Sequence, residues 1–219
     1  MSLAFFRRYL EPADRLNEIL FGLIMVLTFT LTAGLTIEDG PDAARELLAT
    51  LGCNLAWGVI DGAMFLMGAL LERSRRVRTL TAVQQATDET TALGEVDRVL
   101  DATVLALASP EERARVGRAV VAVARRLPPE RTRLHRDDVY GAVASGLLVI
   151  LATLPAVVPF LLMSHAHRAL RVSNFLLVGL LFATGYAWGR HAHAGAWRSG
   201  FAFLIIGSAL VATAIALGG

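Results

Sequence analysis

Long apolar segments separated by short charged ones make up most of this chain. A helix needs about 20 mostly apolar residues to cross the roughly 30 Å hydrocarbon core of a bilayer. Polar and apolar residues do not alternate within the apolar segments, so they lack the pattern of a membrane-spanning strand. The sequence therefore predicts five transmembrane helices, over residues 19–37, 47–71, 140–163, 172–189 and 199–218.

One long polar segment, residues 72–138, interrupts this pattern and carries 13 Arg against 11 acidic residues. An apolar stripe that includes Val96 and Leu100 predicts a helix over 83–108. Ser109 as an N-cap and Pro110 at the first helical position predict a second helix, which stops before Pro128. We expect an all-α fold, a five-transmembrane-helix bundle with a cytoplasmic helical insert between helices two and three. Its parts are an N-terminal anchor with two spans (1–71), the insert (72–138) and three spans (139–219).

Composition supports a membrane protein. Of the 219 residues, 55% are hydrophobic and 18% are charged, whereas soluble domains have about 45–50% and 25%. All 21 basic residues are Arg, and they lie beside the apolar spans, which favours a role in membrane orientation over nucleic-acid binding. Cys53 is the only cysteine, so no internal disulfide is expected. The first residues lack the pattern of a signal peptide.

Arginine placement predicts the orientation, because cytoplasmic loops are rich in basic residues. Arg7, Arg8 and Arg15 precede the first span, and further arginines lie near both ends of the insert. The loop after the first span is mostly acidic. We therefore expect the N-terminus and the insert to be cytoplasmic and the C-terminus to lie outside.

Asp61 is the most unusual residue of the second span, because it lies near the middle of an apolar segment. An ionisable group at that depth is costly and suggests function. Asn54, Gly58, Gly68 and Met64 or Phe65 share its helical face by spacing. The alternative is that Asp61 and Asn54 only form hydrogen bonds to another helix.

The first span offers a matching stripe, in which Glu18, Met25 and Thr32 are seven residues apart and Thr28 lies beside them. Counted from the cytoplasmic side, Glu18 is expected at the inner mouth, Met25 level with Met64 or Met67, and Thr28 level with Asp61. Alternatively, Glu18 is an interfacial residue, and the methionines fill the core.

Carboxylate and thioether ligands together favour Fe²⁺ or Mn²⁺ over Mg²⁺ or Ca²⁺. The predicted metal ligands are Asp61, Met64, Asn54, Glu18 and Met25. A carboxylate in a low-dielectric site can also exchange a metal for a proton, so Asp61 and Glu18 are the predicted proton-coupling residues.

Several motifs, in order along nearly the whole chain, carry a family resemblance. They are Thr32-Ala33-Gly34, then Gly58 with Asp61-Gly62-Ala63-Met64, a charged helical insert, LPAVVPF over 154–160 and ALRVSNFLL over 169–177. With these motifs the chain resembles the vacuolar iron transporter family, in a divergent bacterial form. The resemblance implies a homodimeric five-helix exporter in the bacterial inner membrane. It moves Fe²⁺ or Mn²⁺ out of the cytosol against protons, along a path at the dimer interface.

The chain departs from the family pattern at three places. Phe21, Gly22 and Leu23 stand where the family has Asn-Asp-Gly, and Ala69-Leu70 replaces its Gly-Glu. The insert, which the resemblance implies collects metal, contains no methionine.

The leading hypothesis is proton-coupled efflux of a divalent transition metal, with no tightly bound cofactor and no enzymatic activity. The expected partners are the lipid bilayer, the metal ion and a second copy of the chain, with no nucleic acid. A non-transporting membrane scaffold and a proton-coupled transporter of another small solute are the alternatives.

Overall fold

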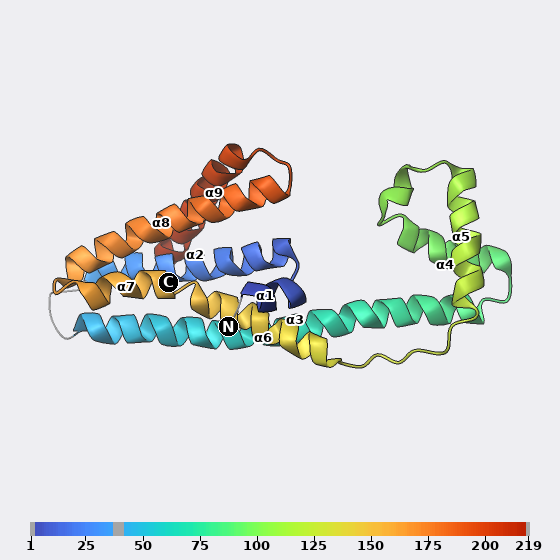
Figure 1. The fold of residues 1–219 in the computed structure, drawn as a ribbon, viewed down its shortest axis with the longest axis horizontal. Coiled ribbons are helices and arrows are strands. Elements are labelled where there is room, and N and C mark those ends of the chain that lie inside the picture. The colour runs from blue at the N-terminus through green and yellow to red at the C-terminus, as the bar shows by residue number, and fades with distance from the viewer. Residues whose placement is uncertain (1–2, 37–41, 218–219) are drawn as a thin grey trace. The chain divides into compact units, whose positions relative to one another are not determined.

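The computed structural model describes residues 3–36 and 42–217. The chain divides into two compact units, one formed by residues 1–66 and 136–219 and the other by residues 67–135. Each is described by itself. Within the described residues every regular element is a helix (Figure 1).

The first unit contains the helices expected to cross the membrane. Five segments are long and apolar enough to do so, which confirms the all-α class with five spans. The helices are α1 (Leu3–Tyr9), α2 (Pro12–Thr36), the first part of α3 (Asp42–Gln85), α6 (Arg136–Leu151), α7 (Leu154–Leu162), α8 (Ala166–His191) and α9 (Ala196–Ala216).

The third predicted span is divided into α6 and α7 next to Pro155. Helix α6 ends at Leu151, and α7 begins at Leu154 with Pro155 in its first turn and Pro159 inside it. Proline has no backbone N–H, so it cannot continue the hydrogen-bond ladder of a preceding helix. Ser173 of α8 donates a hydrogen bond to the carbonyl of Ala156 at 3.0 Å, which joins α7 to α8.

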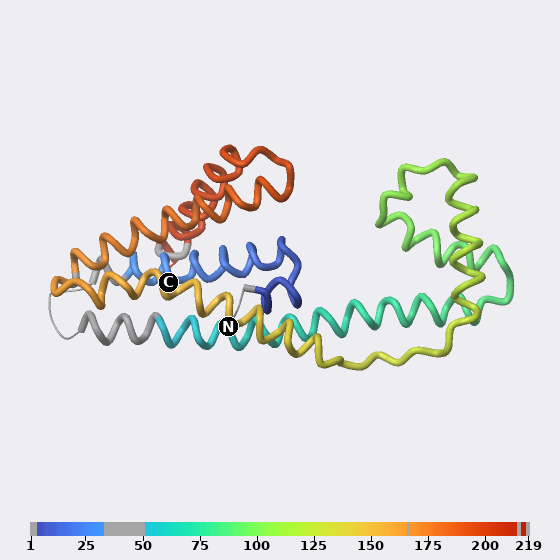
Figure 2. Tube along the Cα trace, in the orientation of Figure 1, coloured from blue at the N-terminus to red at the C-terminus, as the bar shows by residue number. Residues whose placement is uncertain are grey.

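The core of the first unit lies where α2, α8 and α9 meet. Leu23, Val26 and Leu27 of α2 are at most 2% exposed, as are Leu177 of α8 and Val211 of α9. Figure 2 shows α8 lying beside both α2 and α9. The short α1 packs its own apolar side chains against α6, with Phe6 and Leu10 beside Ala144 and Leu148.

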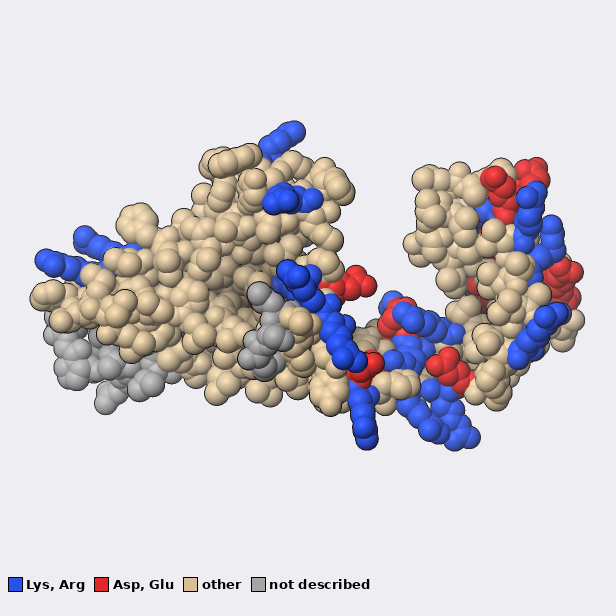
Figure 3. All heavy atoms as spheres, in the orientation of Figure 1, with Lys and Arg blue, Asp and Glu red and all other residues tan. Residues whose placement is uncertain are grey.

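The second unit contains the last part of α3, α4 (Glu89–Leu100), a 3₁₀ turn η1 (Val104–Leu107) and α5 (Pro110–Ala124). Its core is small and aliphatic, and consists of Val83, Ala92, Val96, Leu100, Val121 and Ala124. Figure 3 shows many charged side chains over this unit, whereas the visible face of the first unit is largely uncharged.

The predicted single helix over 83–108 is wrong. Helix α3 ends at Gln85, and Asp88 begins α4 because its side chain accepts a hydrogen bond from Thr91 N at 2.7 Å. A second break follows Leu100, before η1. The apolar stripe continues across both breaks. The spacing of apolar residues therefore does not indicate where the helix ends and begins again.

The predicted start of the next helix is confirmed. Ser109 and Glu112 form a capping box, in which the Ser109 N–H donates to Glu112 at 2.9 Å and the Glu112 N–H donates to Ser109 Oγ at 3.3 Å. The bond from the Ser109 backbone N–H holds the pKa of Glu112 below its usual value, because it stabilises the charged carboxylate.

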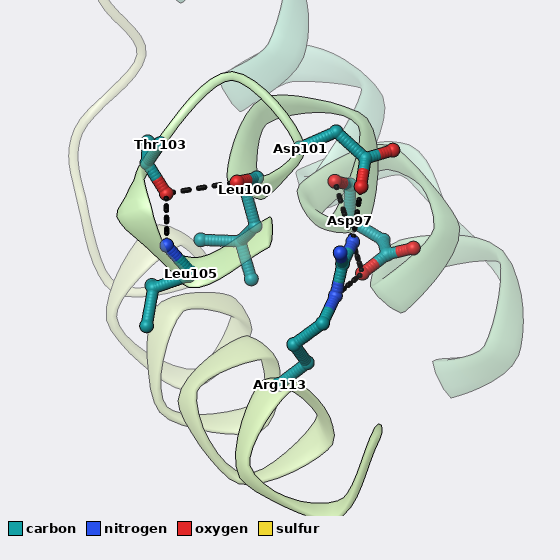
Figure 4. Close-up of polar contacts among 6 residues, drawn as sticks. All are labelled: Asp97, Leu100, Asp101, Thr103, Leu105 and Arg113. Carbon is teal, nitrogen blue, oxygen red and sulfur yellow. Dashed lines mark hydrogen bonds and ion pairs between the residues drawn. The ribbon is translucent and has the colours of Figure 1, made fainter. Parts of the chain in front are cut away.

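Arg113 ties the first turn of α5 to the last turn of α4 (Figure 4). Its Nη2 donates to Asp97 Oδ1 at 2.5 Å and to Asp101 Oδ1 at 2.6 Å. Its side chain is only 17% exposed, whereas both carboxylates are more than half exposed. The two carboxylates raise the pKa of Arg113 further above its usual value, so the guanidinium remains charged.

Candidate functional site

The candidate site depends on a close approach between α3 and α6. A Cβ atom added at Gly58 would lie 2.7 Å from the carbonyl oxygen of Gly146, and one added at Gly62 would lie 2.9 Å from that of Ala142. Such distances leave no space for a larger side chain, so the two backbones are in direct contact. Small residues four apart on each helix are the usual way in which membrane helices pack this closely.

This approach brings Asp61 of α3 to Ser145 of α6. The Ser145 hydroxyl donates a hydrogen bond to Asp61 Oδ2 at 2.5 Å, and Ser145 is fully buried. Hydrogen bonds to an ionised acceptor are shorter and stronger than neutral ones. The bond therefore fixes one oxygen of the Asp61 carboxyl group between two helices.

Glu18 of α2 is the third member of the site. Its half-buried carboxyl group interacts with the side chains of both Asp61 and Ser145. Nearby, the rings of Phe21 and Trp57 lie 5.7 Å apart in an edge-on arrangement, which shows that α2 and α3 are adjacent at this level. Three helices thus contribute one polar side chain each to a single cluster.

These contacts correct the predicted depths of residues in the first two spans. Glu18 lies beside Asp61, whereas the prediction placed Glu18 at the cytoplasmic end of the span and Thr28 at the level of Asp61. The same antiparallel register places Met25 level with Asn54, and not with Met64 or Met67. The prediction measured depth from the ends of the apolar segments, whereas the register of α2 against α3 follows from the contact of Glu18 with Asp61.

Asn54 faces the same side of α3 as Asp61 but lies two turns away, about 10 Å along the axis. It is fully buried, and neither its side-chain oxygen nor its side-chain nitrogen has a hydrogen-bond partner among the described residues. An unsatisfied buried amide costs about 1–3 kcal/mol. Asn54 is thus a separate polar position next to the cluster.

The structure does not bring the predicted methionines into the carboxyl cluster. Met64 is 62% exposed. Three residues along a helix place it about 60° away from Asp61 around the axis. Met25 is half-buried on α2, at the level of Asn54. The site is therefore built from oxygen atoms.

Ser145 is the residue that sequence reasoning missed. It lies in the run Gly141-Ala142-Val143-Ala144-Ser145-Gly146, whose small residues signal a helix contact. That signal indicates close packing but does not identify the helix that Ser145 faces.

Two carboxyl groups side by side repel each other when both are ionised, and a cation or a shared proton between them relieves the repulsion. Carboxylate and hydroxyl oxygens suit hard and borderline divalent ions. Among the described residues, no three His, Cys, Asp or Glu side chains lie close enough together to hold a metal ion. The arrangement fits a site that holds an ion weakly, as a transport site requires.

Asp61 is not sealed inside the bundle, since it is only partly buried. The most apolar stretch of α3 has 11% of its residues buried, against 22–39% in the other four spans. Ile60 and Met64, which neighbour Asp61 on this helix, are 45% and 62% exposed. The face of α3 next to the site is thus uncovered by the rest of the chain.

Comparison with protein families finds a match over most of the chain. The model described as the VIT family matches residues 69–219, which is more than half of the chain and includes α6 with Ser145. A search of curated proteins finds no match.

Proposed function

The chain belongs to the VIT family, and from that premise we propose that it exports a divalent transition metal, Fe²⁺ or Mn²⁺, in exchange for protons. Membrane transport of metal ions is the general activity that the family implies, and the protein is an integral membrane protein. The metal, the protons and the direction are our proposal.

The observation that carries the proposal is the cluster of Glu18, Asp61 and Ser145. Two carboxyl groups meet between apolar helices, and a buried hydroxyl fixes one of them at 2.5 Å. Intramembrane carboxyl groups are expensive and typically belong to ion pathways or proton relays. The family pattern has its acids at other positions, one of which corresponds to Phe21, Gly22 and Leu23 in this chain. Because these three residues contain no carboxyl group, the cluster supplies the two acids instead.

Proton coupling follows from alternate occupation of this cluster. A divalent ion between the carboxylates displaces the proton that they would otherwise share. When protons are abundant on the outer side, they displace the metal and release it there. The same two side chains then bind metal again from the cytoplasmic side.

A second copy of the chain completes the proposed transporter. The uncovered face of α3 next to Asp61 is apolar and includes Met64, whose thioether could add a softer ligand from an interface. Burial against a partner would also exclude lipid from the polar cluster. We place this dimer in a bacterial inner membrane, with the N-terminus and the 67–135 unit in the cytoplasm.

Purified protein in liposomes that contain a metal-sensitive dye and a pH-sensitive dye tests the proposal. We expect Fe²⁺ or Mn²⁺ uptake with opposite proton movement, and loss of both in Asp61→Asn and Glu18→Gln. Thr30→Val is the matched control, because it breaks a different interhelical polar contact, the 2.6 Å bond from Thr30 Oγ1 to Asn174 Oδ1.

Wild-type transport rates in Asp61→Asn would show that the cluster is not the transport site. Absence of metal movement in folded wild-type protein would favour the scaffold alternative. Proton movement without metal would favour a transporter of another solute.

A further inference from the structure

An open groove of about 970 Å³ lies within the second unit, between the last part of α3, α4 and α5. All of its lining residues fall between Glu72 and Leu127, so the groove belongs to this unit alone. Pockets for single small ligands measure about 300–1,000 Å³. The groove is therefore large enough for one flexible small molecule.

Aliphatic side chains form most of the groove. Val83 and Val96 are buried, at 1% and 3% exposure, whereas Val99, Val120 and Val123 are 40–58% exposed. A cluster of exposed aliphatic residues on an otherwise charged unit commonly marks a binding surface. The groove requires an apolar occupant.

The α3 side of the groove changes from charged to apolar along the helix. Glu72, Arg75 and Arg76 line it first, followed by Leu80 and Val83 about two turns further on. Arg98 of α4 also lines the groove but is paired with Glu95 at 2.7 Å, so Arg75 and Arg76 are the guanidinium groups that face an incoming anion beside one carboxylate. The ion pair from Arg76 to Glu72, at 3.2 Å, is 75% and 55% exposed, so it is weak and easily replaced.

The groove does not fit the metal-collecting role that the family resemblance implies for the insert. Glu72 is the only carboxylate in its lining, which contains no His, Cys or Met. A transition-metal site needs several such ligands. The charge and the apolar walls point to another class of ligand.

We infer that this groove binds a long-chain fatty acid, with its carboxylate at Arg75 and Arg76 and its acyl chain along the valines. Guanidinium groups pair well with carboxylates, and the valine walls match an acyl chain. A neutral amphiphile would offer no negative charge to the guanidinium groups of Arg75 and Arg76. A short acid would leave the valines exposed to water.

Photo-cross-linking of the full chain in lipid nanodiscs tests this inference. The probe is a 16-carbon fatty acid with a diazirine near the end of its chain, and labelled peptides are located by mass spectrometry. We expect labelling within residues 96–127 that unlabelled 16-carbon acid displaces. Competitor affinity should rise about fourfold per added methylene, so an eight-carbon acid should compete poorly.

Two pairs of variants give matched controls. Val123→Asp should reduce groove labelling at least fivefold, whereas Val104→Asp should not, because Val104 is exposed but lies outside the groove. Arg75→Gln with Arg76→Gln should reduce labelling similarly, and Arg118→Gln should have no effect. Circular dichroism verifies that each variant remains helical.

The inference is overturned if labelling occurs only in the membrane spans, or if the four variants label equally. It is also overturned if the 16-carbon alcohol competes as well as the acid, since the arginines would then have no role.

Discussion

Gly146→Ala tests whether the polar cluster depends on the contact between α3 and α6. A Cβ at residue 146 would overlap the carbonyl oxygen of Gly58, which is backbone and cannot move without its helix. The two helices must therefore separate. Separation would lengthen the 2.5 Å hydrogen bond from Ser145, the residue before Gly146, to Asp61, which lies three residues after Gly58.

The magnitude follows from two opposing terms. Overpacking costs about 1–3 kcal/mol, and replacing glycine by alanine within a helix gains about 0.5–1 kcal/mol. Gly146→Ala should thus lose about 0.5–2 kcal/mol. Gly52→Ala is the control on α3, because no atom lies within 4 Å of its added Cβ, so it should gain about 0.5–1 kcal/mol.

Thermal unfolding in one detergent or nanodisc preparation measures the difference. At about 2–4 °C per kcal/mol for a domain of this size, Gly146→Ala should unfold several degrees below Gly52→Ala. Gly58→Ala meets the same contact from the other side, 2.7 Å from the Gly146 carbonyl oxygen. The double variant should therefore lose less stability than the sum of the single losses. Equal unfolding temperatures for Gly146→Ala and Gly52→Ala would refute the close approach.

Two further predictions concern single polar contacts. Ser145→Ala removes the donor to Asp61, and since hydrogen bonds to charged groups contribute about 1.5–3 kcal/mol, metal affinity should fall about tenfold or more, whereas Ser173→Ala should leave it unchanged. In the second unit, the folded-state pKa of Glu112 lies below its ordinary value of 4.5. Its contribution to stability is therefore present above about pH 4.5 and is lost as the pH falls through the folded pKa. Protection of α5 amides from hydrogen exchange should decrease over that acidic range, and less so in Glu112→Gln.

Each of these predictions has a clear contrary result. If Ser145→Ala binds metal as tightly as wild type, the hydroxyl has no part in holding Asp61 for the ion. If Glu112→Gln shows the same loss of protection as wild type, other acidic groups cause the acid sensitivity of α5.

The membrane architecture could be predicted because its signals are local. Length and apolar composition identify a spanning helix without knowledge of its neighbours, and Pro155 interrupts the third span whatever surrounds it. The Ser109 cap was visible for the same reason, since its partner Glu112 is three residues away. In contrast, Asp88 caps α4 inside an apolar stripe that continues unbroken in the sequence.

The composition of the site was harder to predict because it depends on which helices meet, and at what level. Glu18 and Asp61 were both identified as candidates, but their contact depends on the register of α2 against α3. Ser145 is one small residue among several until the contact of Gly58 with Gly146 places it against Asp61. Met64 shows the converse, because a spacing of three residues from Asp61 did not make it a member of the cluster, and its side chain is 62% exposed.

Manganese binding to the purified protein, followed by electron paramagnetic resonance, tests most directly whether the paired carboxyl groups hold the transported ion. Free Mn²⁺ gives a sharp spectrum that weakens on binding, so the titration reports affinity without any transport step. We predict saturable binding by wild type and by Thr30→Val, with affinity at least tenfold lower in Asp61→Asn and Glu18→Gln. Unchanged Mn²⁺ affinity in both carboxyl variants would contradict the account.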